Sequence, residues 1–269
     1  HPMVDLNLFK NLRLSASAGS IGIAFMAMLG MMFLLTQYLQ FVQGYSPLDT
    51  GYRLVPMAMG FLVGAPTSAA FVAKTNAKVV MSVGMLLVAI AVGSMAFLDV
   101  GTTYWLTGSL IFLMGLGMAN TMAPATDSVM AAVPEAQAGV GSALNDTVRQ
   151  IGGALGVGIF GSIMSSVYAS SMTDAVVGLP TAAADAASNQ IGAALQVAGS
   201  LEDGAGGELV TASKQAFIDG ASSVYIIAGI VALIGMAFVV KFMPGYDLVP
   251  GEVEDDTATR PVVATELAT

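Results

Sequence analysis

SASAGSIGIAFMAMLGMMFLLTQYLQFV, residues Ser15–Val42, decides the fold of this chain. No charged residue occurs between Arg13 and Asp49. A helix that crosses a bilayer needs about 20 mostly apolar residues, because the hydrocarbon core is about 30 Å thick and a helix rises about 1.5 Å per residue. The stretch is long enough and apolar enough to cross the hydrocarbon core, so it predicts a transmembrane helix.

Five further stretches of the same kind follow along the chain. They are Tyr52–Val72, Val79–Leu98, Tyr104–Met122, Val148–Tyr168 and Ser222–Val240. The whole chain is 55% hydrophobic and 10% charged, with a mean hydropathy of +0.77, whereas about a quarter of the residues are charged in ordinary soluble domains. We therefore expect an all-α integral membrane protein, built as a bundle of six transmembrane helices.

Composition also limits the chemistry. The chain has no Cys, and its single His is residue 1, which argues against thiolate catalysis, a Ser-His-Asp set and most metal sites. No pair of carboxylates lies within an apolar stretch. We expect no enzyme, no metal and no cofactor. The net charge of −9 comes mostly from the polar segments 169–214 and 247–269, so it indicates solvated loops and no nucleic-acid partner.

The basic residues predict the orientation in the membrane. If the six helices alternate in direction, seven of the nine Lys and Arg residues fall on one side, and only Arg53 and Lys214 fall on the other. The seven are Lys10, Arg13, Lys74, Lys78, Arg149, Lys241 and Arg260. Because cytoplasmic loops carry an excess of Lys and Arg, both termini are expected in the cytoplasm.

This orientation divides the chain into five parts. Residues 1–14 form a cytoplasmic lead-in, 15–168 the first five transmembrane helices, and 215–243 the last one. Residues 169–214, rich in Ala, Gly, Ser and Asp, are expected to form a polar external loop that is partly helical and mobile, or alternatively a small folded cap. The acidic tail, 244–269, is expected to be cytoplasmic and disordered. The start with His-Pro rather than Met predicts a truncated chain.

The densest polar cluster is GSALNDTVRQIGGALGVG, Gly141–Gly158. Asn145 and Arg149 are four residues apart and share a helix face, Asp146 and Arg149 can pair, and Gln150 extends the patch. An ionised group in a bilayer has to pair or face a water-filled cavity, which indicates a gating or proton-linked role. The cluster can equally be the start of an interfacial helix, from which Arg149 reaches the lipid headgroups.

Glycines follow the cluster directly. Gly152 and Gly156 have the small-xxx-small spacing that lets two helices approach closely, Gly153 lies between them, and Gly60 and Gly64 repeat the spacing. A phosphate-binding loop would need a strand before the glycines, and none is expected here. We interpret these five glycines as helix-packing residues.

Other polar residues lie near helix ends. Gln37, Tyr38 and Gln40 lie near the external end of the first helix, and Asn120 and Asp127 near the cytoplasmic end of the fourth. The first three and Asn120 can line a substrate cavity or bond to neighbouring helices. Asp127 is either a proton-linked acid or an interfacial residue.

Four segments resemble one known family. They are FLLTQYLQFVQGYSPLDTGYRLVPMAMG (Phe33–Gly60), FVAKTNAKVVMSVGMLL (Phe71–Leu87), GVGSALNDTVRQIGGALGVGIFGSI (Gly139–Ile163) and AFIDGASSVYIIAGIVALIG (Ala216–Gly235). In order and spacing they resemble the C-terminal half of the major facilitator superfamily, in its branch of drug–proton antiporters with fourteen spans. One departure is the second segment, where a loop that is rich in Gly and Arg in the family is reduced to Lys74, Asn76 and Lys78.

The resemblance implies a half of the major facilitator fold, made of two inverted three-helix repeats over Asp5–Leu98 and Gly101–Lys241. It also implies export of small hydrophobic or cationic drug-like compounds in exchange for protons, across a bacterial plasma membrane. Such a half would need the missing N-terminal half to enclose a cavity, and it would be inactive alone. A different possibility stays open, namely a membrane-embedded interaction or scaffold subunit that pairs through its Gly-rich helix faces.

Overall fold

The computed structural model describes residues 10–134, 137–201 and 203–245, and within them it contains helices and no strand. Six helical segments are long and apolar enough to cross a membrane. The helices are α1 (Leu12–Gln37), continued by a π-helical turn at Tyr38–Val42, then α2 (Pro47–Arg53), α3 (Val55–Lys74), α4 (Ala77–Ser94), a 3₁₀ turn at Met95–Phe97, α5 (Tyr104–Ala131), α6 (Ala138–Met172), α7 (Thr181–Asn189), α8 (Ile191–Ala198) and α9 (Asp203–Phe242). The acidic tail is expected to be disordered, and its residues from 246 on lie outside the described part of the chain.

The second apolar stretch is divided into α2 and α3. Ser46 begins α2, because its Oγ accepts a hydrogen bond from the Asp49 backbone N–H at 3.1 Å and donates one to Asp49 Oδ2 at 2.7 Å. Pro47 occupies the first helical position, where its missing N–H costs nothing. Leu54 ends α2, and α3 starts at the next residue.

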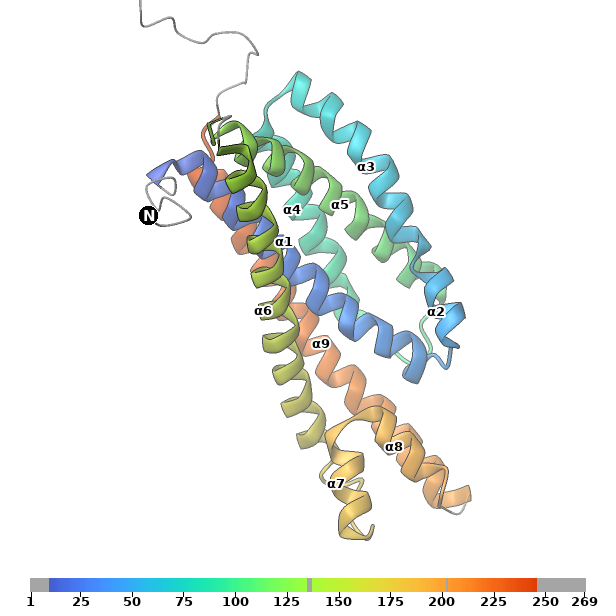
Figure 1. Ribbon diagram of the computed structural model, residues 1–269. Coiled ribbons are helices and arrows are strands. Elements are labelled where there is room, and N and C mark those ends of the chain that lie inside the picture. The colour runs from blue at the N-terminus through green and yellow to red at the C-terminus, as the bar shows by residue number, and fades with distance from the viewer. Residues whose placement is uncertain (1–9, 135–136, 202, 246–269) are drawn as a thin grey trace, which may run out of the picture.

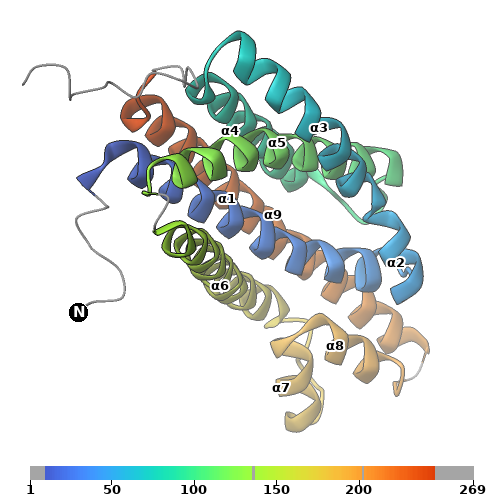
Figure 2. The same ribbon diagram turned by 45° about the horizontal axis from the view of Figure 1, so that its top comes forward.

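The long helices alternate in direction (Figure 1). We call the end with the start of α1 and the end of α9 the N end, and the end with α7 and α8 the cap end. The ends of α3 and α5 and the starts of α4 and α6 also lie at the N end. Figure 2 shows α1 between the group α3, α4 and α5 on one side and α6 on the other, with α9 behind α1.

The helix pairs follow an approximate twofold exchange. The exchange relates α1 to α5, α3 to α6 and α4 to α9. Under it, the contact of α1 with α6 corresponds to the contact of α5 with α3. In addition, α1 packs against α5, and α4 packs against α9. This pattern agrees with two three-helix repeats, α1–α3–α4 and α5–α6–α9. The exchange is incomplete, because α6 packs extensively along α9 whereas α3 barely contacts α4.

Glycines form the seam between α1 and α6. A Cβ added at Gly152 would overlap the backbone carbonyl of Gly22, and one at Gly156 would overlap that of Met26. Backbone atoms cannot move aside, so these two positions require glycine. A Cβ at Gly153 would meet only the tip of the Leu29 side chain, which can change its rotamer.

The seam between α3 and α5 repeats this arrangement. A Cβ at Gly60 would overlap the Phe112 carbonyl oxygen, and one at Gly64 would lie 2.5 Å from the Ala119 Cβ. In return, a Cβ at Gly115 would overlap the Met57 carbonyl oxygen. The five glycines that the sequence singles out therefore all lie where two helices of this chain approach each other.

The segment between α6 and α9 is helical and packed, which agrees with the small folded cap that the sequence left as the alternative to a partly helical loop. α6 continues to Met172, and α9 already begins at Asp203, twelve residues before the expected start at residue 215. Between them α7 and α8 bury one side, formed by Ala187, Ile191, Ala194 and Ala198. The Tyr168 hydroxyl donates a hydrogen bond to the Ala187 carbonyl at 3.2 Å and ties α6 to α7. At 40 residues, α9 is about twice as long as a bilayer requires.

Candidate functional site

An open groove of about 320 Å³ lies between α3, α5 and α6 toward the N end of the bundle. Phe61 and Ala65 line it from α3, Arg149 lines it from α6, and α5 contributes Ala119, Met122, Ala123, Thr126 and Asp127. The groove thus combines apolar walls with one basic and one acidic side chain on facing helices. Concave apolar sites with a few polar groups are the usual form of small-molecule sites.

Arg149 connects three helices at the bottom of this groove. Its Nη2 donates to Thr126 Oγ1 on α5 at 3.1 Å, and its guanidinium carbon lies 5.5 Å from the centre of the Phe25 ring on α1. Nη1 lies 3.9 Å from Asp146 Oδ1 on α6 itself, as the sequence spacing predicts. Its Nε is buried and has no hydrogen-bond partner in the described structure.

The rest of the predicted cluster points in several directions. Asn145 is 7% exposed, and its buried Oδ1 has no partner among the described residues. Asp146 and Gln150 are exposed. Asp127 lines the groove with Arg149 and is exposed to solvent. The ion pairs of the described residues are Arg53–Asp49 and Arg149–Asp146, so Asp127 and Arg149 share a groove without forming a pair.

The cavity candidates at the other helix ends separate. Gln37 lines a recess at the cap end, together with Phe33 of the same helix, whereas Gln40, in the π-helical turn, is not among its lining residues. Asn120 is nearly buried, donates to the Leu116 carbonyl at 2.8 Å, and lines a different cavity of about 160 Å³ between α3, α4 and α5. The four candidates therefore do not form one site.

Tyr38 bonds to a neighbouring part of the bundle, which is the second of the two roles that the sequence left open for it. Its side chain is 2% exposed. Its hydroxyl donates to the Asp99 carbonyl at 2.9 Å and accepts a hydrogen bond from Gln43 Nε2 at 2.7 Å. These bonds hold the cap end of α1 to the connection between α4 and α5, so Tyr38 is a structural residue of the bundle.

A sequence model described as "Major Facilitator Superfamily" matches residues 2–157 of this chain. The chain belongs to the Major Facilitator Superfamily. The superfamily consists of membrane transporters, which agrees with six apolar helices in a multi-pass bundle and with the expectation that the chain is not an enzyme.

Relatives in this superfamily carry names that refer to drug resistance. The chain is 32% identical to the tetracenomycin C resistance and export protein of Streptomyces glaucescens, over 88% of this chain and 45% of the relative. It is 29% identical to the methyl viologen resistance protein SmvA of Salmonella typhimurium, over 81% and 44%. It is 28% identical to the multidrug efflux pump LfrA of Mycolicibacterium smegmatis, over 88% and 48%. The chain spans less than half the length of each of these relatives.

Sequence reasoning missed one arrangement in this Major Facilitator Superfamily chain, around Arg53. Its guanidinium carbon lies 3.5 Å from the centre of the Tyr45 ring and 5.3 Å from that of Tyr104, and the Tyr104 hydroxyl donates to its backbone carbonyl. Arg53 therefore connects the end of α2 to the start of α5. The sequence did contain a signal for these contacts, since Arg53 lies in the same polar connections as three tyrosines, Tyr45, Tyr52 and Tyr104.

Proposed function

We propose that this chain is the C-terminal half of a proton-coupled multidrug efflux transporter that works by alternating access in a bacterial plasma membrane. The observation that carries the proposal is the groove between α3, α5 and α6, which places Arg149 and Asp127 on facing helices among apolar side chains. The groove suits a small hydrophobic or cationic drug-like compound, and the exposed Asp127 carboxylate is the proposed proton-linked group. The names of the relatives support this substrate class.

The exposed faces of α3 and α6 support a missing N-terminal half. Both helices carry large exposed apolar side chains along their length, among them Met59, Leu62 and Phe71 on α3 and Ile151 and Leu155 on α6. α3 and α6 lie on opposite sides of α1 (Figure 2). We propose that an N-terminal half packs against these two helices and closes the groove, as in the fourteen-span branch.

Export is tested with the full-length protein in everted membrane vesicles. Addition of ethidium to energised vesicles is expected to dissipate part of the pH gradient, because each transported cation would exchange for protons. Asp127→Asn is expected to remove this response while membrane insertion remains unchanged. Ethidium accumulation that continues after the pH gradient has been collapsed would contradict proton coupling.

The alternative of a scaffold subunit is weakened by the structure. The glycines that would form its pairing faces already pack inside the chain, Gly152 and Gly156 against α1 and Gly60 against α5. We expect residues 1–269 expressed alone to confer no resistance to methyl viologen, whereas the full-length protein raises the minimum inhibitory concentration several-fold in a strain without related pumps. Resistance from the fragment alone would mean that it works as a homodimer.

The proposed orientation places the N end in the cytoplasm. Seven basic residues were predicted on the cytoplasmic side, and six of them lie in the described part of the chain; the seventh is Arg260. Each of the six lies at the N end, within about three turns of the start or end of a helix. Single cysteines at Leu12 (61% exposed, N end) and Val177 (79% exposed, cap end) report on this, since the chain has no other cysteine. An impermeant maleimide on intact cells is expected to label the cysteine at position 177 only. Labelling confined to position 12 would reverse the orientation.

A further inference from the structure

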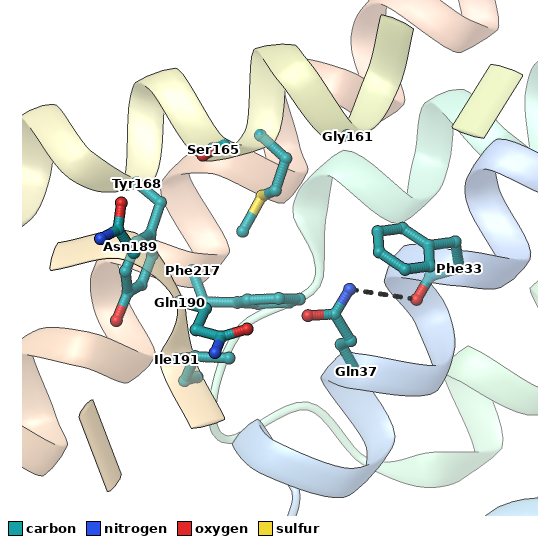
Figure 3. Close-up of a pocket in the computed structure, with 10 residues that line it drawn as sticks. Phe33, Gln37, Gly161, Ser165, Tyr168, Asn189, Gln190, Ile191 and Phe217 are labelled. Carbon is teal, nitrogen blue, oxygen red and sulfur yellow. Dashed lines mark hydrogen bonds between the residues drawn. The ribbon is translucent and has the colours of Figure 1, made fainter. Parts of the chain in front are cut away.

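A recess of about 170 Å³ lies at the cap end, where α1, α6, α9 and the junction of α7 and α8 meet (Figure 3). Its floor is aromatic and fixed. Phe217 is 1% exposed and Tyr168 2% exposed, and the Tyr168 hydroxyl is bonded to the Ala187 carbonyl. Packing and the hydrogen bond therefore hold both rings of the floor in place in this structure.

The rim of the recess is polar and open. Gln37 on α1 and Gln190 at the start of α8 direct their amides toward the space beside the Phe217 ring (Figure 3). The Gln37 amide nitrogen donates to the Phe33 carbonyl at 3.5 Å, which turns its oxygen toward that space. The Phe33 ring is 45% exposed and forms the wall next to Gly161.

The electrostatic character follows from these side chains. No Lys, Arg, Asp or Glu is among the residues that line the recess, so its field comes from ring faces and amide oxygens. Ring faces and carbonyl oxygens both attract positive charge. A cavity of about 150 Å³ is large enough for one benzene ring, so the recess fits one ring of a larger ligand whose remainder extends outward.

One face of α1 connects the recess with Arg149, which lines the groove. Phe25, Leu29, Phe33 and Gln37 follow at four-residue spacing, and three of them contact successive positions of α6: Phe25 lies over Arg149, Leu29 against Gly153 and Phe33 next to Gly161. A strip of apolar side chains on α1 thus leads from Arg149 to the recess at the cap end.

We propose that this recess is a second ligand site, which binds one ring of an aromatic cation at the cap end of the bundle. The proposal deepens the proposed export function by adding a place where the substrate stops after it leaves the groove. The site is built partly from α7 and α8, so the cap contributes directly to binding.

The test is site protection in the full-length protein, with ethidium as the probe. A cysteine in place of Gln190 lies on the rim, and Gln196→Cys on the same short helix is exposed outside the recess and serves as the matched control. Saturating ethidium is expected to slow maleimide labelling of Gln190→Cys about fivefold or more, and that of Gln196→Cys less than twofold. Uncharged phenanthridine is expected to protect neither cysteine.

Two further variants separate the site from general effects. Phe33→Ala removes an exposed wall residue, and Ser165→Leu fills the recess from α6; each, combined with Gln190→Cys, is expected to abolish protection by ethidium. Unchanged protection in both would overturn the proposal, as would equal protection of Gln190→Cys and Gln196→Cys. Protection by phenanthridine as strong as by ethidium would overturn the assignment to cations. If ethidium protects Gln190→Cys but is not exported, the recess stands as a binding site and only the export function is overturned. If ethidium is exported but does not protect Gln190→Cys, the recess proposal is overturned and the export function stands.

Discussion

Arg149→Ala in the full-length protein is expected to lower the rate of drug export about 10- to 100-fold, while the amount of protein in the membrane stays the same. The side chain joins α6 to Thr126 on α5 and lies over Phe25 on α1, so its loss removes a charged hydrogen bond across the groove. Hydrogen bonds to charged groups contribute about 1.5–3 kcal/mol, and about 1.4 kcal/mol corresponds to a factor of ten. Initial rates of ethidium efflux measure the effect.

Arg149→Lys distinguishes a gate from a lipid anchor. Lys lacks the planar fork that contacts Thr126 and Asp146 at the same time, so a gate residue should retain only part of its activity as Lys. A headgroup anchor would behave differently, since Lys extends to the headgroups about as well as Arg. Lys241→Ala, at the end of α9, controls for the loss of a basic residue at the same end of the bundle. Near-normal export in both Arg149 variants would disprove the gate hypothesis.

Thr126→Val provides an independent check on the same contact. It keeps the shape of the side chain and removes the hydroxyl that accepts the hydrogen bond from Arg149. Together with Arg149→Lys it forms a double-mutant cycle, in which a coupling energy clearly different from zero is expected because the two residues are in contact.

The six spans could be predicted from the sequence because each depends only on local composition. Ser15–Val42 has no charge to place in lipid, and that property needs no knowledge of its neighbours. The cap was harder to predict because α7 and α8 are short, so neither gives an apolar stretch long enough to stand out in the sequence. The pattern within α8 was the better signal: Ile191, Ala194 and Ala198 recur at helical spacing and form its buried side.

The candidate site was predictable only where its contacts are local in sequence. The pairing of Arg149 with Asp146 follows from their spacing within one helix, and the structure contains it. The contacts of Arg149 with Thr126 and Phe25 depend on how α5 and α1 pack against α6. Tyr38 shows the reverse problem. As a polar residue near a helix end it suggested either a cavity or a bond to a neighbouring helix, and the sequence could not choose because its partner Asp99 lies in a connection 61 residues away.

Gly156→Ala, like Gly152→Ala, is expected to cause a large loss of folded protein, because both methyl additions meet backbone atoms in the seam between α1 and α6. The new Cβ would overlap the Met26 carbonyl oxygen, which is fixed within the backbone hydrogen bonds of α1. Added methyl groups in a well-packed interior typically cost about 1–3 kcal/mol, and we expect the upper part of this range because no side chain can move away. The yield of monodisperse protein on size exclusion and the apparent melting temperature measure the loss.

Two glycines with open surroundings serve as controls, Gly158 on the same helix and Gly207 on α9, since a Cβ at either position meets nothing within 4 Å. Ala at these sites is expected to be neutral or to stabilise by up to about 1 kcal/mol, because Gly in a helix loses more conformational entropy on folding than Ala does. Gly153→Ala should fall between the two groups, because the Leu29 side chain that it meets can change its rotamer.

If Gly156→Ala were tolerated as well as Gly207→Ala, α1 and α6 could not be as close in the folded protein as this arrangement requires. The connection that Arg149 makes from α6 to α1 and α5 would then have to be reconsidered too, since the same seam sets its distance from Phe25.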